Sequence, residues 1–539
     1  MSKQTQIYDT TLRDGAQMEG ISLSVDDKLK ITKLLDELGV DFIEGGWPGA
    51  NPKDVEFFKK INELNLKNAK LVAFGSTRKT NSKVQNDPIL TALLQANTEY
   101  ITIVGKSWDM HVDIALNVSK EENLKMISES IEYLKANKRK VFFDAEHYFD
   151  SFKSNPEYAL SVIKTACNAG ADAIVLCDTN GSSLPEEIKK GTEKAKETIG
   201  DKCTIGIHVH NDCDLAVANS LAAYEAGARQ IQGTINGIGE RCGNANLISI
   251  IGNLELKYKE KVLPTNNLTK LTSVSRQISD ILNLNPNDHQ PFVGSCAFAH
   301  KGGLHASAVK KDSKTYEHIE PGLIGNTNKI IVSEQAGISN IISVCEKYNL
   351  PLGDSPKETA GQVLKKIKEL EHKGYQYEAA SASFVLLLLE LLNERPKFFE
   401  LVDYRVMSSS KQLAEATVRI KVRGEVIHTA SLGVGPGNAI DNALRKALNH
   451  YYPSLKEFKL VDFKVRILDG HDGSAAKTRV HVESSDGTIK WDTVGVSGNI
   501  IDATWLAITE SLEYGLWIKS KEQKQETKQK QNPHVEANL

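Results

Sequence analysis

The sequence lacks the features that mark several specialised classes of protein. Its 66 basic residues are balanced by 69 acidic ones, so it offers no strongly basic surface to nucleic acid or to an anionic membrane. Its seven cysteines form no CxxC pair and it shows no signal peptide, which predicts reduced thiols in a cytoplasmic protein. The most apolar run, 384–392, is much shorter than the roughly twenty residues of a bilayer span. We therefore expect neither a nucleic-acid partner nor a membrane.

The chain is long, and its first half repeats one pattern of secondary structure. Its 539 residues exceed what one hydrophobic core can hold. From residue 5 to about residue 240, short β-rich runs alternate with helical segments, of which 27–38 has a wide apolar face. We count eight β-rich runs: 6–10, 41–45, 71–75, 100–104, 141–146, 173–178, 205–210 and 230–235. Eight such units over this length predict a (β/α)8 TIM barrel, with a doubly wound sheet of fewer strands as the alternative.

The rest of the chain divides into three regions. We expect the barrel to occupy 1–280, followed by a mainly helical linker subdomain at 281–395. The third region, 396–516, contains Gly-Asn-x-Ile-Asp twice, each time after two β-like runs and before a helix. This duplication predicts an α+β domain with pseudo-twofold symmetry, which either only builds a core or also places a ligand cleft on its axis. The polar segment 517–539 is expected to be a disordered tail.

Polar and ionisable residues follow at least five of the eight predicted strands. In a (β/α)8 barrel, catalytic groups lie at the carboxyl ends of the strands and in the loops that follow. The residues in these positions are Arg13, Asp14, Glu44, Glu146, Asp178, Thr179, His208, His210, Glu240, Arg241 and Asn244. A single buried polar group is usually structural, whereas this many at one end of a barrel predict an active site.

The strongest local pattern is His208-Val209-His210. Residues i and i+2 of a strand face the same side, so both imidazoles project together. With a carboxylate opposite, for which Asp14 is the candidate, they can form an open two-His, one-carboxylate metal site. Such a site suits Zn²⁺ or Mn²⁺, and an added amide oxygen would also permit Mg²⁺. Free coordination positions would suit a chelating substrate such as a 2-oxo acid.

Three motifs resemble those of a known family. The segment 8–17 (YDTTLRDGAQ) closely resembles the signature of the DRE-TIM metallolyases. The segments 206–212 (GIHVHND) and 236–245 (NGIGERCGNA) resemble the two signatures of its condensing branch, which includes isopropylmalate, homocitrate and citramalate synthases. The resemblance extends through Gly-Leu-His at 303–305 to the duplicated domain, and 42–54 (FIEGGWPGANPKD) is most similar to citramalate synthases. Cys242 departs from the condensing signature, which more often has Ala, and a cysteine in such a loop is also found in the lyase branch.

The resemblance implies a Claisen condensation of acetyl-CoA, as co-substrate, with pyruvate and water to give (R)-citramalate and CoA, a route to isoleucine. It implies that Asp14, His208 and His210 hold a divalent metal ion, with Asn244 nearby or ligating. Arg13 would polarise the keto oxygen of the substrate.

Further roles are implied for residues elsewhere at the barrel mouth and in the linker. Thr179 would bind the carboxylate of the oxo acid, and Glu146 would lie near the acetyl group. His305 and Tyr316 would reach the site from the linker subdomain of the other protomer of a homodimer. His305 is the first choice for the general base and Glu146 the second. The duplicated domain resembles the family's regulatory domain, for which we predict isoleucine as the feedback inhibitor.

The motifs do not identify the residues that select the oxo acid, and Glu44, Asp144 and Arg78 are candidates. With 2-oxoisovalerate or 2-oxoglutarate in place of pyruvate, the enzyme would be a 2-isopropylmalate or homocitrate synthase. An acyl-CoA lyase of the same superfamily is a further alternative. A third is a non-catalytic amino-acid sensor, which the intact set of candidate metal ligands argues against.

Overall fold

The computed structural model describes most of the chain. The described residues are 4–49, 51–61, 64–300, 305, 308–309, 311–330, 338–348, 350–353, 355–377, 380–468 and 476–531. They belong to two compact units, one formed by Met1–Phe298 and His318–Asn328 and the other by Ala299–Glu317 and Lys329–Leu539. Across these ranges, no helix has the length and apolar character needed to cross a membrane.

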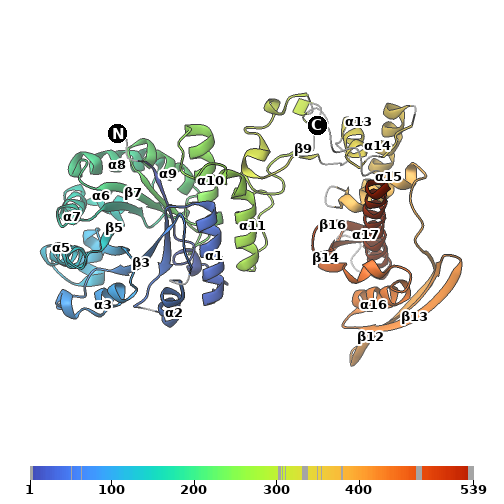
Figure 1. Ribbon diagram of the computed structural model, residues 1–539, viewed down its shortest axis with the longest axis horizontal. Coiled ribbons are helices and arrows are strands. Elements are labelled where there is room, and N and C mark those ends of the chain that lie inside the picture. Colours follow the sequence, from blue (N-terminus) through green and yellow to red (C-terminus); the bar gives the residue numbers. More distant parts are fainter. Residues whose placement is uncertain are drawn as a thin grey trace. The chain divides into compact units, whose positions relative to one another are not determined.

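The first unit contains a closed barrel of eight parallel strands, which confirms the predicted fold (Figure 1). The strands are β1 (Gln6–Asp9), β2 (Phe42–Gly46), β3 (Lys70–Ser76), β4 (Tyr100–Lys106), β5 (Lys140–Glu146), β6 (Ala173–Asp178), β7 (Thr204–Val209) and β8 (Gln230–Gly233). Each strand pairs with the next along the chain, and β8 pairs with β1 from Gln6↔Gln230 to Asp9↔Gly233. The β-rich runs read from the sequence match these strands closely.

Helices pack around the outside of the barrel. They are α1 (Val25–Leu38), α2 (Pro52–Lys60), α3 (Pro88–Gln95), α4 (Asp109–His111), α5 (Lys120–Ala136), α6 (Tyr148–Ser154), α7 (Pro156–Asn168), α8 (Pro185–Ile199), α9 (Ala216–Glu225), α10 (Leu247–Asn253) and α11 (Leu271–Ile281). The first of them begins with a capping box between Ser24 and Asp27, which satisfies backbone N–H groups at its start. It ends at Gly39, whose φ of 95° suits a residue without a side chain.

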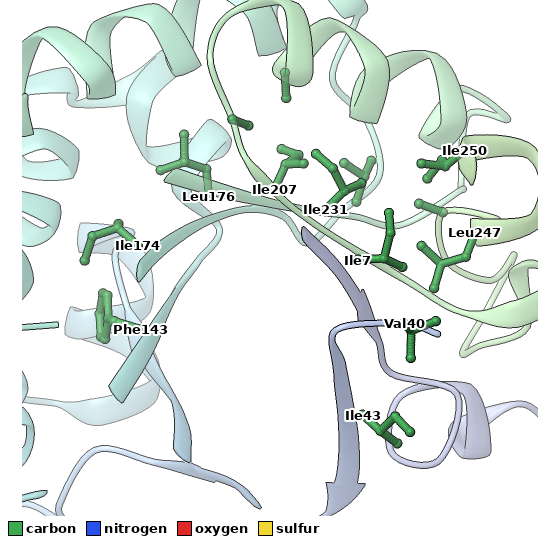
Figure 2. Packing of buried hydrophobic residues seen from close by; sticks show 14 of the residues in the cluster. Ile7, Val40, Ile43, Phe143, Ile174, Leu176, Ile207, Ile231, Leu247 and Ile250 are labelled. Atoms are coloured by element: carbon green, nitrogen blue, oxygen red, sulfur yellow. The ribbon is translucent and has the colours of Figure 1, made fainter. Parts of the chain in front are cut away.

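Neighbouring residues on each strand point to opposite sides of the barrel wall. Ile7 packs in the large apolar cluster between strands and helices, together with Ile43 and Ile231 (Figure 2). The next residue, Tyr8, belongs to a smaller cluster made only of strand residues, including Phe42. The barrel interior is therefore filled at one end, and polar side chains converge at the other end, where the strands finish.

The second unit contains the predicted duplication. Its helices are α13 (Ile338–Lys347), α14 (Pro356–His372), α15 (Ser381–Leu391), α16 (Pro436–Leu448) and α17 (Ile500–Gln531). Short strands β9 (Ala299–His300) and β10 (Lys329–Ile330) pair with each other, and two antiparallel sheets have three strands each. One sheet is β11 (Glu400–Ser409), β12 (Gln412–Val422) and β13 (Glu425–Gly433), and the other is β14 (Lys459–Ile467), β15 (Thr478–Ser485) and β16 (Lys490–Ser497). Each repeat is therefore βββα rather than the expected ββα. The first strand of each repeat was missed. β11 and β14 are exposed along most of their length, although apolar residues alternate at 402, 404 and 406 and at 461, 463, 465 and 467.

Two expected boundaries differ from the structure. The barrel unit continues past residue 280 to Phe298, because Phe292 and Val293 also pack into its core. The final helix extends to Gln531, so the tail is not disordered from residue 517 onward. Trp517 is buried in the core of the second unit, and the Lys, Glu and Gln residues that follow are good helix formers that can extend an existing helix. Residues 301–303 of the Gly-rich patch and 532–539 lie outside the described residues.

The prediction that all seven cysteines are reduced is wrong for one pair. Cys167, near the end of α7, and Cys203, directly before β7, form a disulfide, and their Cα atoms are 6.1 Å apart. A separation of 36 positions concealed this pair in the sequence. The other five cysteines are free.

Candidate functional site

Three side chains with metal-binding atoms meet at the mouth of the barrel. Asp14 follows β1, His208 lies in β7 and His210 follows it, and all three are buried. Asp14 Oδ2 lies 3.1 Å from His208 Nε2 and 3.8 Å from His210 Nε2. One ligand atom from each residue falls within 4.8 Å of the others, which is close enough for one ion. The structure thus brings the two histidines of the HxH pattern to the carboxylate that the sequence suggested.

A glutamine on the neighbouring strand orients one of these ligands. His208 Nδ1 donates a hydrogen bond to Gln232 Oε1 at 3.0 Å, which directs Nε2 toward Asp14. Metal-binding histidines are commonly fixed in this way through their second ring nitrogen. Sequence reasoning missed Gln232, although Gln230 and Gln232 alternate with Ile231 on β8 and therefore point into the barrel.

Asn244 lies beside His210 because the two residues form an isolated β-bridge. The loop between them needs Gly243, whose φ is 94° and where a Cβ atom would lie 2.1 Å from Gly237 O. Neither Asn244 Oδ1 nor Asp14 Oδ2 has a hydrogen-bond partner among the described residues, although both are buried. Buried oxygens without partners are costly, and a bound cation would satisfy both. The donor set of two imidazoles, a carboxylate and an amide oxygen fits a divalent metal ion.

Arg13 places a positive charge beside the same cluster. Its Nε donates to Glu44 Oε2 at 2.6 Å, its Nη1 lies 3.2 Å from Asp14 Oδ1, and its guanidinium stacks on Phe74 at 3.9 Å from the ring centroid. Glu44 is fully buried and also accepts a hydrogen bond from Tyr8 at 2.7 Å. These contacts hold the guanidinium in one orientation while its carboxylate partners balance its charge.

Burial and neighbouring charges shift the titration of several site residues. Burial alone would raise the pKa of Asp14, but Arg13 and the two imidazoles hold that pKa well below its usual range. Burial and the adjacent His208 lower the pKa of His210 to about 4, so this imidazole stays neutral and can bind a metal. Burial and the Glu44 carboxylate raise the pKa of Asp144 to about 7. Asp144 is therefore a candidate proton donor or acceptor near neutral pH.

Thr179 and Glu146 lie at the ends of the adjacent strands β6 and β5. Thr179 Oγ1 accepts a hydrogen bond from the backbone N–H of His147 at 2.9 Å. Its carbonyl oxygen accepts one from Arg241, which also forms an ion pair with Asp212 at 2.8 Å. Glu146 forms an ion pair with Lys106 at 2.5 Å.

Arg78 does not join this cluster, and two further predicted residues lie in the other unit. Arg78 is buried against α5, where its guanidinium binds Glu122 at 2.8 Å and Glu129 at 2.7 Å. These partners give it a structural role that its position after β3 did not reveal. His305 and Tyr316 belong to the second unit, where their rings stack with centroids 4.2 Å apart.

The chain matches three domain families in succession. The HMGL-like family matches residues 4–278, which is the barrel. The homocitrate synthase post-HMGL domain-like family matches 292–375, and the LeuA allosteric (dimerisation) domain matches 378–516. The last two matches cover the linker region and the duplicated domain.

Individual relatives match almost the whole chain. The (R)-citramalate synthase of Aquifex aeolicus (strain VF5) is 53% identical over 521 residues, which cover 96% of this chain and 98% of the relative. The (R)-citramalate synthase of Synechocystis sp. is 52% identical over 95% of this chain and 96% of the relative. A 2-isopropylmalate synthase of Methanocaldococcus jannaschii is 33% identical over 94% of this chain and 93% of the relative. The family inferred from the sequence motifs is confirmed: the chain belongs to the (R)-citramalate synthase family of HMGL-like proteins.

Proposed function

We propose that this protein condenses acetyl-CoA with pyruvate and hydrolyses the thioester, which yields (R)-citramalate and CoA for isoleucine synthesis. The observation that carries the proposal is the buried cluster of Asp14, His208 and His210 beside Arg13. Similarity to (R)-citramalate synthases along nearly the whole chain supports pyruvate as the oxo acid.

The cluster would hold a divalent ion through Asp14, His208 and His210, with Asn244 Oδ1 as a further ligand. Two imidazoles and a carboxylate suit Mn²⁺ or Zn²⁺, and the amide oxygen also allows Mg²⁺. When bound, the ion supplies Lewis acidity toward the keto group of the substrate.

Arg13 is proposed to stabilise the negative charge that develops on the keto oxygen. Because Glu44 binds Nε and Phe74 supports the guanidinium plane, the positive charge is fixed before the substrate arrives. Thr179 is proposed to bind the oxo-acid carboxylate. Since its Oγ1 already accepts the His147 N–H, its own hydroxyl proton is free to be donated to the substrate.

A base must remove a proton from the methyl group of acetyl-CoA. We propose His305 for this step, with Tyr316 stacked on its ring. The His305 side chain is exposed within its unit, so its ring can approach a substrate. Glu146 is the second candidate, although its pairing with Lys106 leaves it less free to accept a proton.

The second unit is proposed to support a homodimer and to bind an amino-acid effector. The match to the LeuA allosteric (dimerisation) domain supports both roles. A cavity of about 450 Å³ lies between β11 and the start of α17 and combines apolar and acidic side chains. Its lining residues are Leu401, Asp403, Tyr404, Val406, Asn499, Ile501 and Asp502. Carboxylates beside an apolar wall suit the ammonium group and side chain of isoleucine.

The metal-site proposal is tested by Gln232→Ala. Without its hydrogen-bond partner, His208 loses its fixed orientation, and affinity for Mn²⁺ or Zn²⁺ should fall about 10- to 100-fold. Titration calorimetry on metal-free protein measures this directly, and Gln277→Ala, at an exposed glutamine of α11, is the control. Equal affinities in the two variants would contradict the role assigned to Gln232.

The reaction itself is tested by CoA release from acetyl-CoA in the presence of Mn²⁺ or Mg²⁺. Pyruvate should be preferred over 2-oxobutanoate, 2-oxoisovalerate and 2-oxoglutarate. Preference for a larger oxo acid would keep the chemistry and change the product. No release with any acid would favour the acyl-CoA lyase alternative, which cleavage assays would then examine.

His305→Ala tests the assignment of the base. Loss of general-base catalysis should lower kcat about 10²- to 10⁴-fold, while metal affinity stays unchanged. His289→Ala, at another exposed histidine, should retain full kcat. Turnover like that of the unmodified protein in His305→Ala would reject His305 and direct attention to Glu146.

The effector proposal predicts that millimolar isoleucine inhibits the condensation. Asp502→Asn should weaken this inhibition, because Asp502 lines the cavity. Asp441→Asn changes the equivalent residue of the other repeat, which binds Arg445 at 2.8 Å, and should leave inhibition intact. Unchanged activity with isoleucine in the unmodified protein would exclude this amino acid as the effector.

A further inference from the structure

A second group of metal-binding side chains lies at the barrel mouth, separate from the first. His111 ends the short helix α4 after β4, and Glu146 and His147 follow each other at the end of β5. One ligand atom from each of these three residues lies within 4.8 Å of the others. None of them belongs to the Asp14 cluster, so the two groups share no ligand.

His147 is oriented in the manner of a metal ligand. Its Nδ1 donates to Asp150 Oδ2 at 2.9 Å, and Asn180 donates to the same oxygen at 3.2 Å. The Nε2 atom is therefore left with its lone pair, as in the carboxylate–histidine pairs that surround bound zinc. The backbone of His147 has a φ of 58°, a strained conformation for a residue with a side chain, which its N–H bond to Thr179 Oγ1 helps to hold.

His111 supplies a buried nitrogen that needs a partner. Its Nδ1 is buried and has no hydrogen-bond partner among the described residues. The centroid of the His111 ring lies 4.3 Å from that of the His147 ring, and 5.2 Å from that of the Trp108 ring, on which it stacks. The His111 ring therefore has little freedom to turn away. An unsatisfied buried nitrogen is costly, and a metal ion between the two imidazoles would satisfy it.

The third ligand, Glu146, is already neutralised by a positive charge. Lys106 Nζ lies 2.5 Å from Glu146 Oε2. A cation bound by the two histidines and Glu146 would replace this ammonium group as the partner of the carboxylate. Lys106 is therefore expected to compete with the metal ion for Glu146.

We propose that His111, Glu146 and His147 form a second metal site, which binds a transition-metal ion such as Zn²⁺ in competition with Lys106. Two imidazoles and one carboxylate favour zinc over magnesium or calcium, which prefer oxygen ligands. If Glu146 acts near the acetyl group, occupancy of this site inhibits condensation. That consequence rests on the proposed function, whereas binding of the ion does not.

The number of bound ions tests the proposal without any substrate. Untagged full-length protein is stripped with a chelator and dialysed against Zn²⁺, and the bound metal is then counted. The unmodified protein should bind two ions per chain, whereas His111→Ala/His147→Ala and His208→Ala/His210→Ala should each bind one. Cys213→Ser/Cys242→Ser removes the two exposed thiols and should still bind two. One ion in the unmodified protein, or two in His111→Ala/His147→Ala, would overturn the proposal.

A gain of affinity provides an independent check that does not depend on a destabilised variant. Lys106→Met removes the ammonium group that competes for Glu146. It should therefore tighten Zn²⁺ binding at the site of His111, Glu146 and His147 severalfold, with no change at the Asp14 site. Unchanged affinity at both sites in a folded Lys106→Met protein would also count against the proposal. Failure of the condensation assay alone would leave both binding results unaffected, so the two hypotheses can be rejected separately.

Discussion

The pairing of β1 with β8 is the constraint on which the site depends. It closes the barrel and brings Asp14 to His208 and His210, almost 200 positions later in the chain. Gln232 lies on β8, between the strands that lead to these ligands, and orients His208 from there. The hydrogen bonds of the barrel wall therefore fix the geometry of the candidate metal site. A flexible loop would need to order the same side chains at an entropic cost of about 1–2 kcal/mol per residue.

Charge balance is the second requirement of this site. Arg13, Asp14 and Glu44 are largely removed from water, and a buried ion without a partner is strongly destabilising. Each of them contacts an opposite charge, and Tyr8 adds a hydrogen bond to Glu44. The cluster therefore has to be assembled as a set, because removal of one member leaves another charge unpaired. This interdependence also explains why the pKa of Asp14 falls although the residue is buried.

The sequence predicted what depends on local pattern and missed what depends on tertiary contact. The barrel strands could be found because apolar runs recur at regular spacing, and Asp14, His208 and His210 because they lie at the ends of such runs or soon after them. β11 and β14 were missed although apolar residues alternate in both, and their antiparallel pairing with β12 and β15 identifies them as strands. The Cys167–Cys203 disulfide and the hydrogen bond from His208 to Gln232 join residues that only the folded barrel brings together. Arg78 has the residue type of a substrate ligand, but its guanidinium is occupied by two carboxylates of α5.

The two βββα repeats keep the same fold while their matching aspartates have different partners. Asp441 is held by Arg445 within its own helix, whereas Asp502 contacts Tyr404, which comes from the other repeat. The aspartate of the first repeat, Asp441, thus stabilises its own helix, whereas that of the second repeat, Asp502, lines a cavity. Such a division lets selection alter the lining of the cavity while the supporting copy maintains the scaffold. Substitutions that reshape this cavity are therefore separated in sequence from those that would disturb the supporting copy.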